Sequence, residues 1–339
     1  MRIVIVVEAW PGEGGVDLPA SAAAVLVAEA WEAGAPGHEV ITLAVGDGGT
    51  RTADALAGER MRLHRADAVA TGEALVLAPP DGAATWNPRD LASALTRLAH
   101  PSGEDEQPER RTVVIPLGDE DPDGEPLDLW GCDMEGPDLA AARAALAPLA
   151  ILALVTSTRP LLGFKGMAAA SLAHRAPDDA GAEAAQERER RWAEVAREAD
   201  VEVAAGAPPT LIASTRLSAA PGSGAAGGLA YALAAVGARL TPGAAYAASI
   251  GGLDAAAETA DLVVAVTRSL TPHGIDHGIV APASAAAARR GVPCVVIAPV
   301  VGAGKRDQMA AGLTGVYECA PGAATLADRI RRVARTWTP

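Results

Sequence analysis

Lysine is almost absent from this chain, which carries only Lys165 and Lys305 among its 28 basic residues. Phosphate chemistry that depends on an ammonium group therefore has two candidates, and arginine supplies the remaining positive charge. Acidic residues outnumber basic ones, and the formal net charge is −14. This balance favours solubility and argues against a nucleic-acid surface or an anionic membrane as the main partner. A small anionic ligand would need positive charge gathered locally.

Cysteine and long apolar segments are also scarce. Cys132, Cys294 and Cys319 match neither a CxxC nor a disulfide pattern. We therefore expect reduced thiols in a cytoplasmic protein and no structural zinc site. The sequence contains no uncharged apolar stretch of about 18 residues, and it opens on a strand-like run at residues 2–7. Membrane spanning and secretion are therefore not expected.

Short apolar runs alternate with helical stretches along the chain, and half of the 339 residues are apolar, enough for two buried cores. The strand-like runs are residues 3–7, 40–45, 113–117, 151–155, 262–266 and 295–301. The clearest helical patterns are residues 20–31, 138–146, 182–199, 282–290 and 324–335. Because parallel strands need crossover connections, usually helices, this alternation predicts an α/β fold with largely parallel strands. Residues 100–110 and 119–128 are expected to be exposed loops.

The most informative motif is glycine-rich and reads Pro-Gly-Ser-Gly-Ala-Ala-Gly-Gly over residues 221–228. A helical pattern follows, in which Leu229, Leu233 and Val236 share one face. Small side chains at the start of a helix expose backbone N–H groups to which a phosphate can bind. Gly-Ala repeats occur equally where a helix packs tightly on a sheet. The spacing leaves both interpretations open.

Four segments together resemble the bacterial type I glycerate kinase family. The segment beginning at Pro221 is similar to that family's PGAGAAGGLG loop and following helix, and residues 153–167 resemble its CDVTNPLLGPNGA segment. Residues 47–49 resemble ADGGEGT, and residues 260–264 resemble the start of ADLVITGEGRLD. The resemblance implies a Rossmann-like parallel-sheet domain built from residues 1–65 and 251–339. A second α/β domain, residues 66–250, would be inserted and would carry the glycine-rich loop.

The resemblance also implies an activity, namely ATP-dependent phosphorylation of D-glycerate to phosphoglycerate with Mg²⁺. The implied partner is a small anionic substrate such as glycerate, without nucleic acid or membrane. Whether copies of the chain associate as a homo-oligomer stays open.

Several polar groups of the family motifs are replaced in this chain. After the first strand the family's DSFKG becomes residues 8–12, where Glu8 keeps an acid and Pro11 stands in place of the lysine. A proline donates nothing to a phosphate. Asp47 is retained, so Glu8 and Asp47 are the candidate catalytic acids that organise metal or substrate. Asp47 is equally suited to cap the turn beside its glycines.

Positive charge for a phosphate or carboxylate is expected from arginine. Arg159 replaces the asparagine of CDVTNPLLG, and Thr156 replaces its acid. Arg159 either binds an anion bidentately or pairs with a nearby acid at the surface. The acidic run at residues 119–123 either binds a hard cation or is a solvated loop. The candidate substrate- and phosphate-binding residues are Gly222, Ser223, Gly224, Gly227, Gly228, Arg159 and Arg268.

The most altered motif is GEGRLDxQTxxGK, whose place is taken by residues 266–278 without its glutamate or its final lysine. This segment instead carries His273, Asp276 and His277. Histidines at positions i and i+4 ligate a metal on one helix face, although Pro272 and Gly274 disfavour a regular helix. Alternatively, His273 acts as an acid or base near neutral pH, and it is our third candidate catalytic residue. The metal ligands stay unassigned.

Two functional hypotheses follow. The first is an active kinase of the resembled family. The second is a catalytically degenerate or repurposed homologue that binds an anionic small molecule or acts as a regulatory protein. The altered motifs favour the second, because each missing phosphate or metal contact costs on the order of a few kcal/mol in the transition state. The extent of the resemblance along the chain favours the first.

Overall fold

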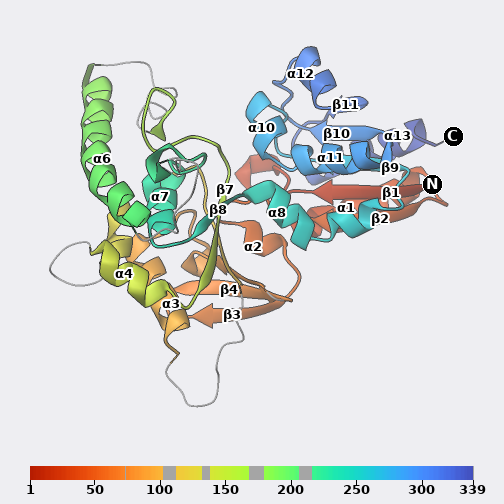
Figure 1. Cartoon of the computed structure of the whole chain (residues 1–339). Coiled ribbons are helices and arrows are strands. Elements are labelled where there is room, and N and C mark those ends of the chain that lie inside the picture. Colours follow the sequence, from red (N-terminus) through yellow and green to blue (C-terminus); the bar gives the residue numbers. More distant parts are fainter. Residues whose placement is uncertain (73, 102–111, 132–137, 168–178, 206–215, 339) are drawn as a thin grey trace. The chain divides into compact units, whose positions relative to one another are not determined.

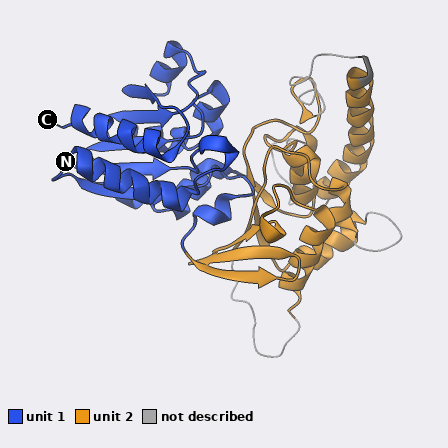
Figure 2. Ribbon diagram, turned by 180° about the vertical axis from the view of Figure 1, so that it is seen from behind, with its two compact units in different colours: residues 1–57, 242–339 blue, residues 58–241 orange. Residues whose placement is uncertain are grey.

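The computed structural model describes residues 1–338 except 73, 102–111, 132–137, 168–178 and 206–215. It divides into two compact units. Unit 1 combines Met1–Ala57 with Pro242–Pro339, and unit 2 is Gly58–Thr241 (Figure 2). Each unit has its own sheet with helices packed on it, so the predicted α/β fold class is confirmed (Figure 1). Most of the loop expected at 100–110, and Cys132, lie outside the described residues.

The sheet of unit 1 is entirely parallel and has the strand order β11-β10-β9-β1-β2. Its strands are β1 (Arg2–Val7), β2 (Glu39–Ala44), β9 (Leu262–Val266), β10 (Cys294–Ala298) and β11 (Gly315–Glu318). In the central strands almost every residue is buried, as in Ile5, Val264 and Ile297. Such continuous apolar runs are typical of parallel strands with both faces covered.

Helices cover both faces of this sheet. One face packs against α1 (Ala20–Gly34) and α13 (Ala323–Thr336), and the other against α8 (Gly243–Ile250), α9 (Leu253–Ala257) and α11 (Val280–Arg290). Shorter elements are η1 (Glu13–Gly15), α2 (Thr52–Ala55), α10 (Pro272–His277) and α12 (Lys305–Ala310). The chain runs outward from β1 to β2 and, in the opposite direction, from β9 to β11. The strand order therefore reverses between β1 and β9, and ligands of open α/β sheets bind beyond the carboxyl ends of the strands at such a point.

The sheet of unit 2 is mixed and has the order β3-β4-β5-β6-β7-β8. The pairs β3–β4 and β4–β5 are antiparallel, whereas β5–β6 and β6–β7 are parallel. The strands are β3 (Glu59–Leu63), β4 (Ala66–Thr71), β5 (Ala74–Ala78), β6 (Thr112–Pro116), β7 (Ala150–Val155) and β8 (Arg239–Pro242). The helices are α3 (Pro88–Ala99), α4 (Leu139–Leu146), α6 (Asp179–Ala205) and α7 (Leu229–Ala235), with short 3-10 turns η2 (Pro80–Gly82), η3 (Pro126–Trp130), η4 (Leu217–Ala219) and η5 (Ala226–Gly228).

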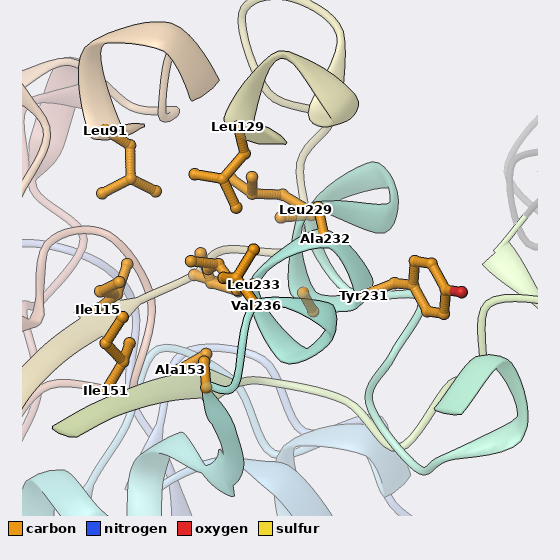
Figure 3. Packing of buried hydrophobic residues seen from close by; sticks show 14 of the residues in the cluster. Leu91, Ile115, Leu129, Ile151, Ala153, Leu229, Tyr231, Ala232, Leu233 and Val236 are labelled. Atoms are coloured by element: carbon orange, nitrogen blue, oxygen red, sulfur yellow. The ribbon is translucent and has the colours of Figure 1, made fainter. Parts of the chain in front are cut away.

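Helix α7 is the centre of the unit 2 core. Leu229 and Leu233 are fully buried, and Val236 at the end of the helix is 6% exposed. Figure 3 shows Leu233 and Val236 on the side of α7 that faces Ile115 and Ile151 of the sheet. The helix that follows the glycine-rich loop is therefore buried along its whole length, and hydrogen bonds from the Tyr231 hydroxyl to Asp200 and from the Trp130 indole to the Ala232 carbonyl add to its apolar packing.

Two expectations about local structure need correction. The loop expected at residues 119–128 ends early, because η3 begins at Pro126 and buries Leu129 and Trp130 in the unit 2 core. The segment around Pro272 is helical, for a reason given below. No helix in the described part of the chain is long and apolar enough to cross a membrane.

Candidate functional site

Glu8 lies where the strand order of unit 1 reverses. It directly follows β1, and its backbone N–H donates to the carbonyl of Val266 at the end of β9. Its carboxylate oxygen Oε2 accepts hydrogen bonds from the Thr267 hydroxyl (2.7 Å) and from the Arg268 backbone N–H (3.0 Å). The side chain therefore bridges the ends of two neighbouring strands. Glu8 is only 6% exposed, so its charge is poorly solvated.

The ionisation of Glu8 is strongly perturbed. Burial, and next the negative charge of Asp47, raise the pKa of Glu8 from 4.5 to about 7, against the hydrogen bonds from Arg268, Thr267 and Ile279, which lower it. A carboxyl group with a pKa near 7 exchanges its proton at neutral pH. This property suits a general acid or base.

Asp47 follows β2, the neighbour of β1. Its Oδ1 atom accepts a hydrogen bond from the Gly49 N–H (2.8 Å), so the capped turn expected from the sequence is present. Gly48, with φ of +91°, approaches the first residue of α8 so closely that a Cβ there would lie 2.3 Å from the Cα of Gly243. Asp47 is exposed, and its Oδ2 atom accepts no hydrogen bond from the described residues. The turn therefore uses one carboxylate oxygen and leaves the other toward solvent.

Two arginines lie next to Asp17. The guanidinium of Arg268 forms an ion pair with Asp17, and Arg51 Nη1 lies 3.9 Å from the same carboxylate. Arg51 Nε also lies 3.7 Å from Asp54 Oδ2, so two arginines and two aspartates form one charged cluster at the carboxyl edge of the sheet. The Arg268 side chain is 47% exposed. Arg51, which the sequence analysis did not select, therefore joins Arg268 as a source of positive charge.

His273 lies on α10, whose formation corrects the expectation against a helix. Thr271 caps the helix by accepting a hydrogen bond from the Gly274 N–H (3.0 Å), and Pro272 occupies the first turn. Proline is favoured there because its missing N–H would have no intrahelical acceptor. The ring centroids of His273 and His277 are 4.8 Å apart.

The glycine-rich loop of unit 2 is buried from Gly222 to Gly228. Four of its backbone N–H groups donate within the chain, and these belong to Ser223, Gly224, Ala225 and Gly228. Their acceptors are the carbonyls of Ala220, Arg159, Gly222 and Ala225. In this conformation these groups hold the loop together and do not form a row of available donors.

The glycines themselves are required by close packing. A Cβ at Gly228 would lie 2.5 Å from the Trp192 ring, and one at Gly224 would lie 2.3 Å from the Pro160 carbonyl oxygen. Gly222, Gly227 and Gly228 also have positive φ angles, which side chains rarely adopt. Tight packing, one of the two interpretations of the motif, thus accounts for these glycines. Anion binding by the loop stays a prediction.

The model of the glycerate kinase family matches residues 121–338, more than half of the chain. The chain belongs to the glycerate kinase family. The curated proteins contain no significant match. A crystal structure of a candidate glycerate kinase 2 from Salmonella typhimurium LT2 superposes with a TM-score of 0.64 over 99% of this chain and 96% of that one, at 18% identity, which shows a common fold.

In this family member, two further candidate residues, Ser223 and Arg159, form hydrogen bonds that hold the glycine-rich loop. The Ser223 hydroxyl is fully buried, accepts a hydrogen bond from the Leu161 N–H (2.9 Å) and donates to the Ser218 carbonyl (3.3 Å). Arg159 accepts the Gly224 N–H through its carbonyl oxygen. Its guanidinium has no ion-pair partner among the described residues, so the surface ion pair considered from the sequence is not formed there.

The acidic run of unit 2 is engaged in side-chain contacts. Asp119 accepts a hydrogen bond from the Thr156 hydroxyl (2.9 Å), and Asp121 accepts two from the Arg188 guanidinium (3.0 Å each). The described residues contain no cluster of three or more histidines, cysteines or acids arranged to hold a metal. The acidic run at residues 119–123 is therefore an exposed loop that these hydrogen bonds attach to neighbouring segments.

The structure brings the candidate residues together in two groups. In unit 1, Glu8, Asp47 and Arg268 share the carboxyl edge of the sheet, and in unit 2, Arg159 contacts the loop 222–228. Thr267 was missed by the sequence analysis. The signal available for it was its position directly after a buried strand, where functional side chains of parallel sheets gather.

Proposed function

We propose that this member of the glycerate kinase family phosphorylates a small hydroxy acid of the glycerate type, with ATP as donor. The supporting observation is the pair Glu8 and Asp47, which lie at the carboxyl ends of adjacent parallel strands and interact electrostatically. Phosphoryl transfer needs carboxylates that hold Mg²⁺ and a group that positions the attacking hydroxyl. Two neighbouring acids with different environments can divide these tasks.

Asp47 fits a magnesium ligand better than Glu8 does. It is exposed, and one of its oxygens accepts no hydrogen bond from the described residues. Mg²⁺ is a hard cation that is usually bound through one or two carboxylates together with water and phosphate oxygens. When bound there it would neutralise negative charge on the donor phosphates.

Glu8 is assigned to the proton. Its pKa of about 7 leaves a substantial fraction ionised at neutral pH, and that fraction can accept the proton of the substrate hydroxyl. The Thr267 hydroxyl and the Arg268 N–H fix the orientation of the carboxylate. Arg268 and Arg51 are the cations assigned to the carboxylate of the hydroxy acid.

ATP fits the described residues less well. Four N–H groups of the loop 222–228 already donate within the chain, so the loop does not offer a triphosphate those donors. This observation favours a second candidate function, binding of a small anion without phosphoryl transfer. In that case Arg51 and Arg268 of unit 1 bind the anion, and the loop 222–228 contributes only to the packing of the unit 2 core.

The experiment is ADP release from Mg²⁺-ATP by the purified chain, with and without D-glycerate, for the wild type and two variants. Asp47→Asn removes a carboxylate that lies three residues beyond the carboxyl end of β2, and Glu39→Gln removes the one on the first residue of β2. The kinase proposal predicts glycerate-dependent turnover that falls roughly 100-fold in Asp47→Asn and persists in Glu39→Gln. Equal turnover in both variants would remove Asp47 from the proposal.

Calorimetry with D-glycerate separates the two candidates. Glycerate binding in a folded protein that releases no ADP would contradict the kinase proposal and support the anion-binding function. Absence of both binding and turnover would contradict both.

A further inference from the structure

A pair of histidines on α10 is not used by the function proposed above. His273 and His277 lie one helical turn apart, at positions i and i+4. We propose that these two imidazoles form a binding site for a borderline transition-metal ion such as Zn²⁺, Ni²⁺ or Cu²⁺, separate from the carboxylates Glu8 and Asp47. This inference does not depend on the proposed kinase activity.

The first support is that α10 has a fixed beginning and a fixed face. Thr271 caps it, and the residue before, Leu270, pairs with Val301 in an isolated parallel bridge. The Leu270 carbonyl accepts hydrogen bonds from the N–H groups of Gly302 (2.9 Å) and Ala303 (2.8 Å). Ile275 packs against the buried core of unit 1. A short helix held in this way presents His273 and His277 in a defined geometry.

The second support is the ring geometry. The centroids of the two rings are 4.8 Å apart, and their planes are inclined by 50°. A metal about 2 Å from one nitrogen of each ring would lie roughly 3 Å from each centroid, which gives an angle of about 100° at the metal. This angle lies between those of octahedral and tetrahedral coordination, so the ring separation is compatible with chelation of one ion.

The third support is access. His273 is exposed and His277 is partly exposed, so an ion can reach both rings from solvent. Two ligands are the expected number, because the described residues contain no cluster of three histidines, cysteines or acids. The remaining coordination positions would be filled by water or by oxygen atoms of a small ligand, as in sites that keep open positions.

The imidazole nitrogens of this site determine which metal ions it can bind. Neutral imidazole nitrogen suits Zn²⁺, Cu²⁺ and Ni²⁺, whereas Mg²⁺ prefers oxygen ligands and retains its water. We therefore expect Cu²⁺ to bind more tightly than Ni²⁺, in the usual order for nitrogen ligands, and Mg²⁺ not to bind at this site.

The test is calorimetric titration of the untagged full chain with ZnCl₂, and separately with NiCl₂ and MgCl₂, for the wild type, His273→Ala, His277→Ala and His64→Ala. His64 is an exposed histidine on the β3–β4 turn and serves as the matched control. Loss of a second-shell partner alone typically lowers metal affinity about 10- to 100-fold, so loss of a ligand should lower it by at least about 10-fold. We expect one Zn²⁺ per wild-type chain, weakened in both helix variants and unchanged in His64→Ala.

To identify the histidines that bind the metal, NMR spectra of protein labelled with ¹⁵N in its histidine rings are recorded with and without Zn²⁺. The proposal predicts that Zn²⁺ shifts the signals missing from the His273→Ala and His277→Ala spectra. It is overturned if wild-type protein binds no Zn²⁺, or if all four proteins bind it equally. Should an alanine variant fail to fold by circular dichroism, His273→Gln and His277→Gln, which keep a polar side chain but no imidazole, give the same comparison.

Discussion

The carboxyl edge of the unit 1 sheet has a buried ionisable group at its centre, whereas unit 2 has a tightly packed glycine-rich loop beside the end of β7, and its polar groups Asp119 and Thr156 are hydrogen-bonded to each other. Glu8 bridges β1 and β9 in unit 1 and is coupled to Asp47. In unit 2 the loop 222–228 packs against the end of β7 and against Trp192, and its N–H groups donate internally. The candidate site of unit 1 is arranged around charge, and the glycine-rich loop of unit 2 around close packing.

This difference separates two reasons for which a family motif survives in a chain. The glycines of the loop are needed to bring segments into contact, and that need remains whether or not a phosphate binds. Charged groups of a catalytic site have no comparable role in packing, and several are replaced here, as by Pro11 and Thr156. A preserved glycine pattern is therefore good evidence for the fold and weak evidence for the chemistry.

The largest expected effect tests the packing role of the loop. Gly228→Ala places a Cβ 2.5 Å from the Trp192 ring at a φ of +99°, whereas Gly237→Ala, at a φ of +107°, meets no atom within 4 Å. Positive φ costs about 1–2 kcal/mol in both variants, and overpacking adds about 1–3 kcal/mol in the first. Urea unfolding should show Gly228→Ala to be the less stable variant by that margin. If the two variants are equally stable and only Gly228→Ala loses anion binding, the result would favour a role of the loop 222–228 in binding an anion.

The next effect tests the charge at the unit 1 edge through the pH dependence of stability. The pKa of Glu8 is about 7 in the folded chain and near 4.5 when solvated, so the folded state binds more protons between these values. Stability therefore falls as pH rises from about 4.5 to about 7, by roughly 3 kcal/mol from this group, and then levels off.

Glu8→Gln should remove this component, whatever its effect on stability at a single pH. The readout is the difference in unfolding free energy between wild type and variant, measured at pH 5 and pH 8. Asp47→Asn should reduce the component, because the Asp47 charge raises the pKa of Glu8, and Glu39→Gln should leave it unchanged. A difference that is the same at both pH values would contradict a perturbed Glu8.

A smaller effect concerns the single hydroxyl inside the glycine-rich loop. Ser223→Ala removes the nearer acceptor of the buried Leu161 N–H, which keeps the Ser218 carbonyl at 3.2 Å, so the unfolding free energy should fall by about 1 kcal/mol. Thr158→Ala, at an exposed position of the same unit, should change stability by less than about 0.5 kcal/mol. Chemical denaturation of the two variants checks this, and equal values would mean that the Ser223 hydroxyl does not support the loop.

The smallest expected effect on stability comes from two arginine substitutions. They test whether Arg268, at the carboxyl edge of the unit 1 sheet, contributes to ligand binding and not to folding. Arg268→Ala removes a partly exposed ion pair with Asp17, and Arg289→Ala removes a comparable exposed pair with Asp254. Both should change stability by less than about 1 kcal/mol. Arg268→Ala alone should weaken glycerate binding, by about 10-fold or about 1.4 kcal/mol in calorimetry. An equal loss in Arg289→Ala would argue against a specific site.

The six strands predicted from apolar runs are all present, and in all of them except the edge strand β2 most residues are buried, so their sequences are largely apolar. Strands β3, β4, β5, β8 and β11 were not predicted, and β3 shows one reason. Glu59, Arg60 and Arg62 occupy three of the five positions of β3, as is typical of an edge strand, and such a strand has no continuous apolar run. β3 therefore forms because it pairs with β4 across a tight turn, and not because its own residues favour a strand.

The candidate acids could be found from the sequence because Glu8 directly follows β1 and Asp47 lies three residues after β2. Their environments could not, since the donors to Glu8 lie about 260 residues further along the chain. The helix around Pro272 shows the reverse case. Its cap, Thr271, and its first-turn proline are both local, so the sequence contained the signal for the helix that places His273 and His277 on one face.

The sequence by itself determined the α/β class and the family, because strand patterns, turn glycines and motif spacing are local properties of the chain. Only the tertiary structure decided what the motifs do. Trp192 and Pro160 cover the glycines of the loop, and Thr267 and Asp47 set the pKa of Glu8 together with its burial. These contacts join residues distant in sequence, and both packing and electrostatic energy depend on distance in space, which spacing along the chain does not give.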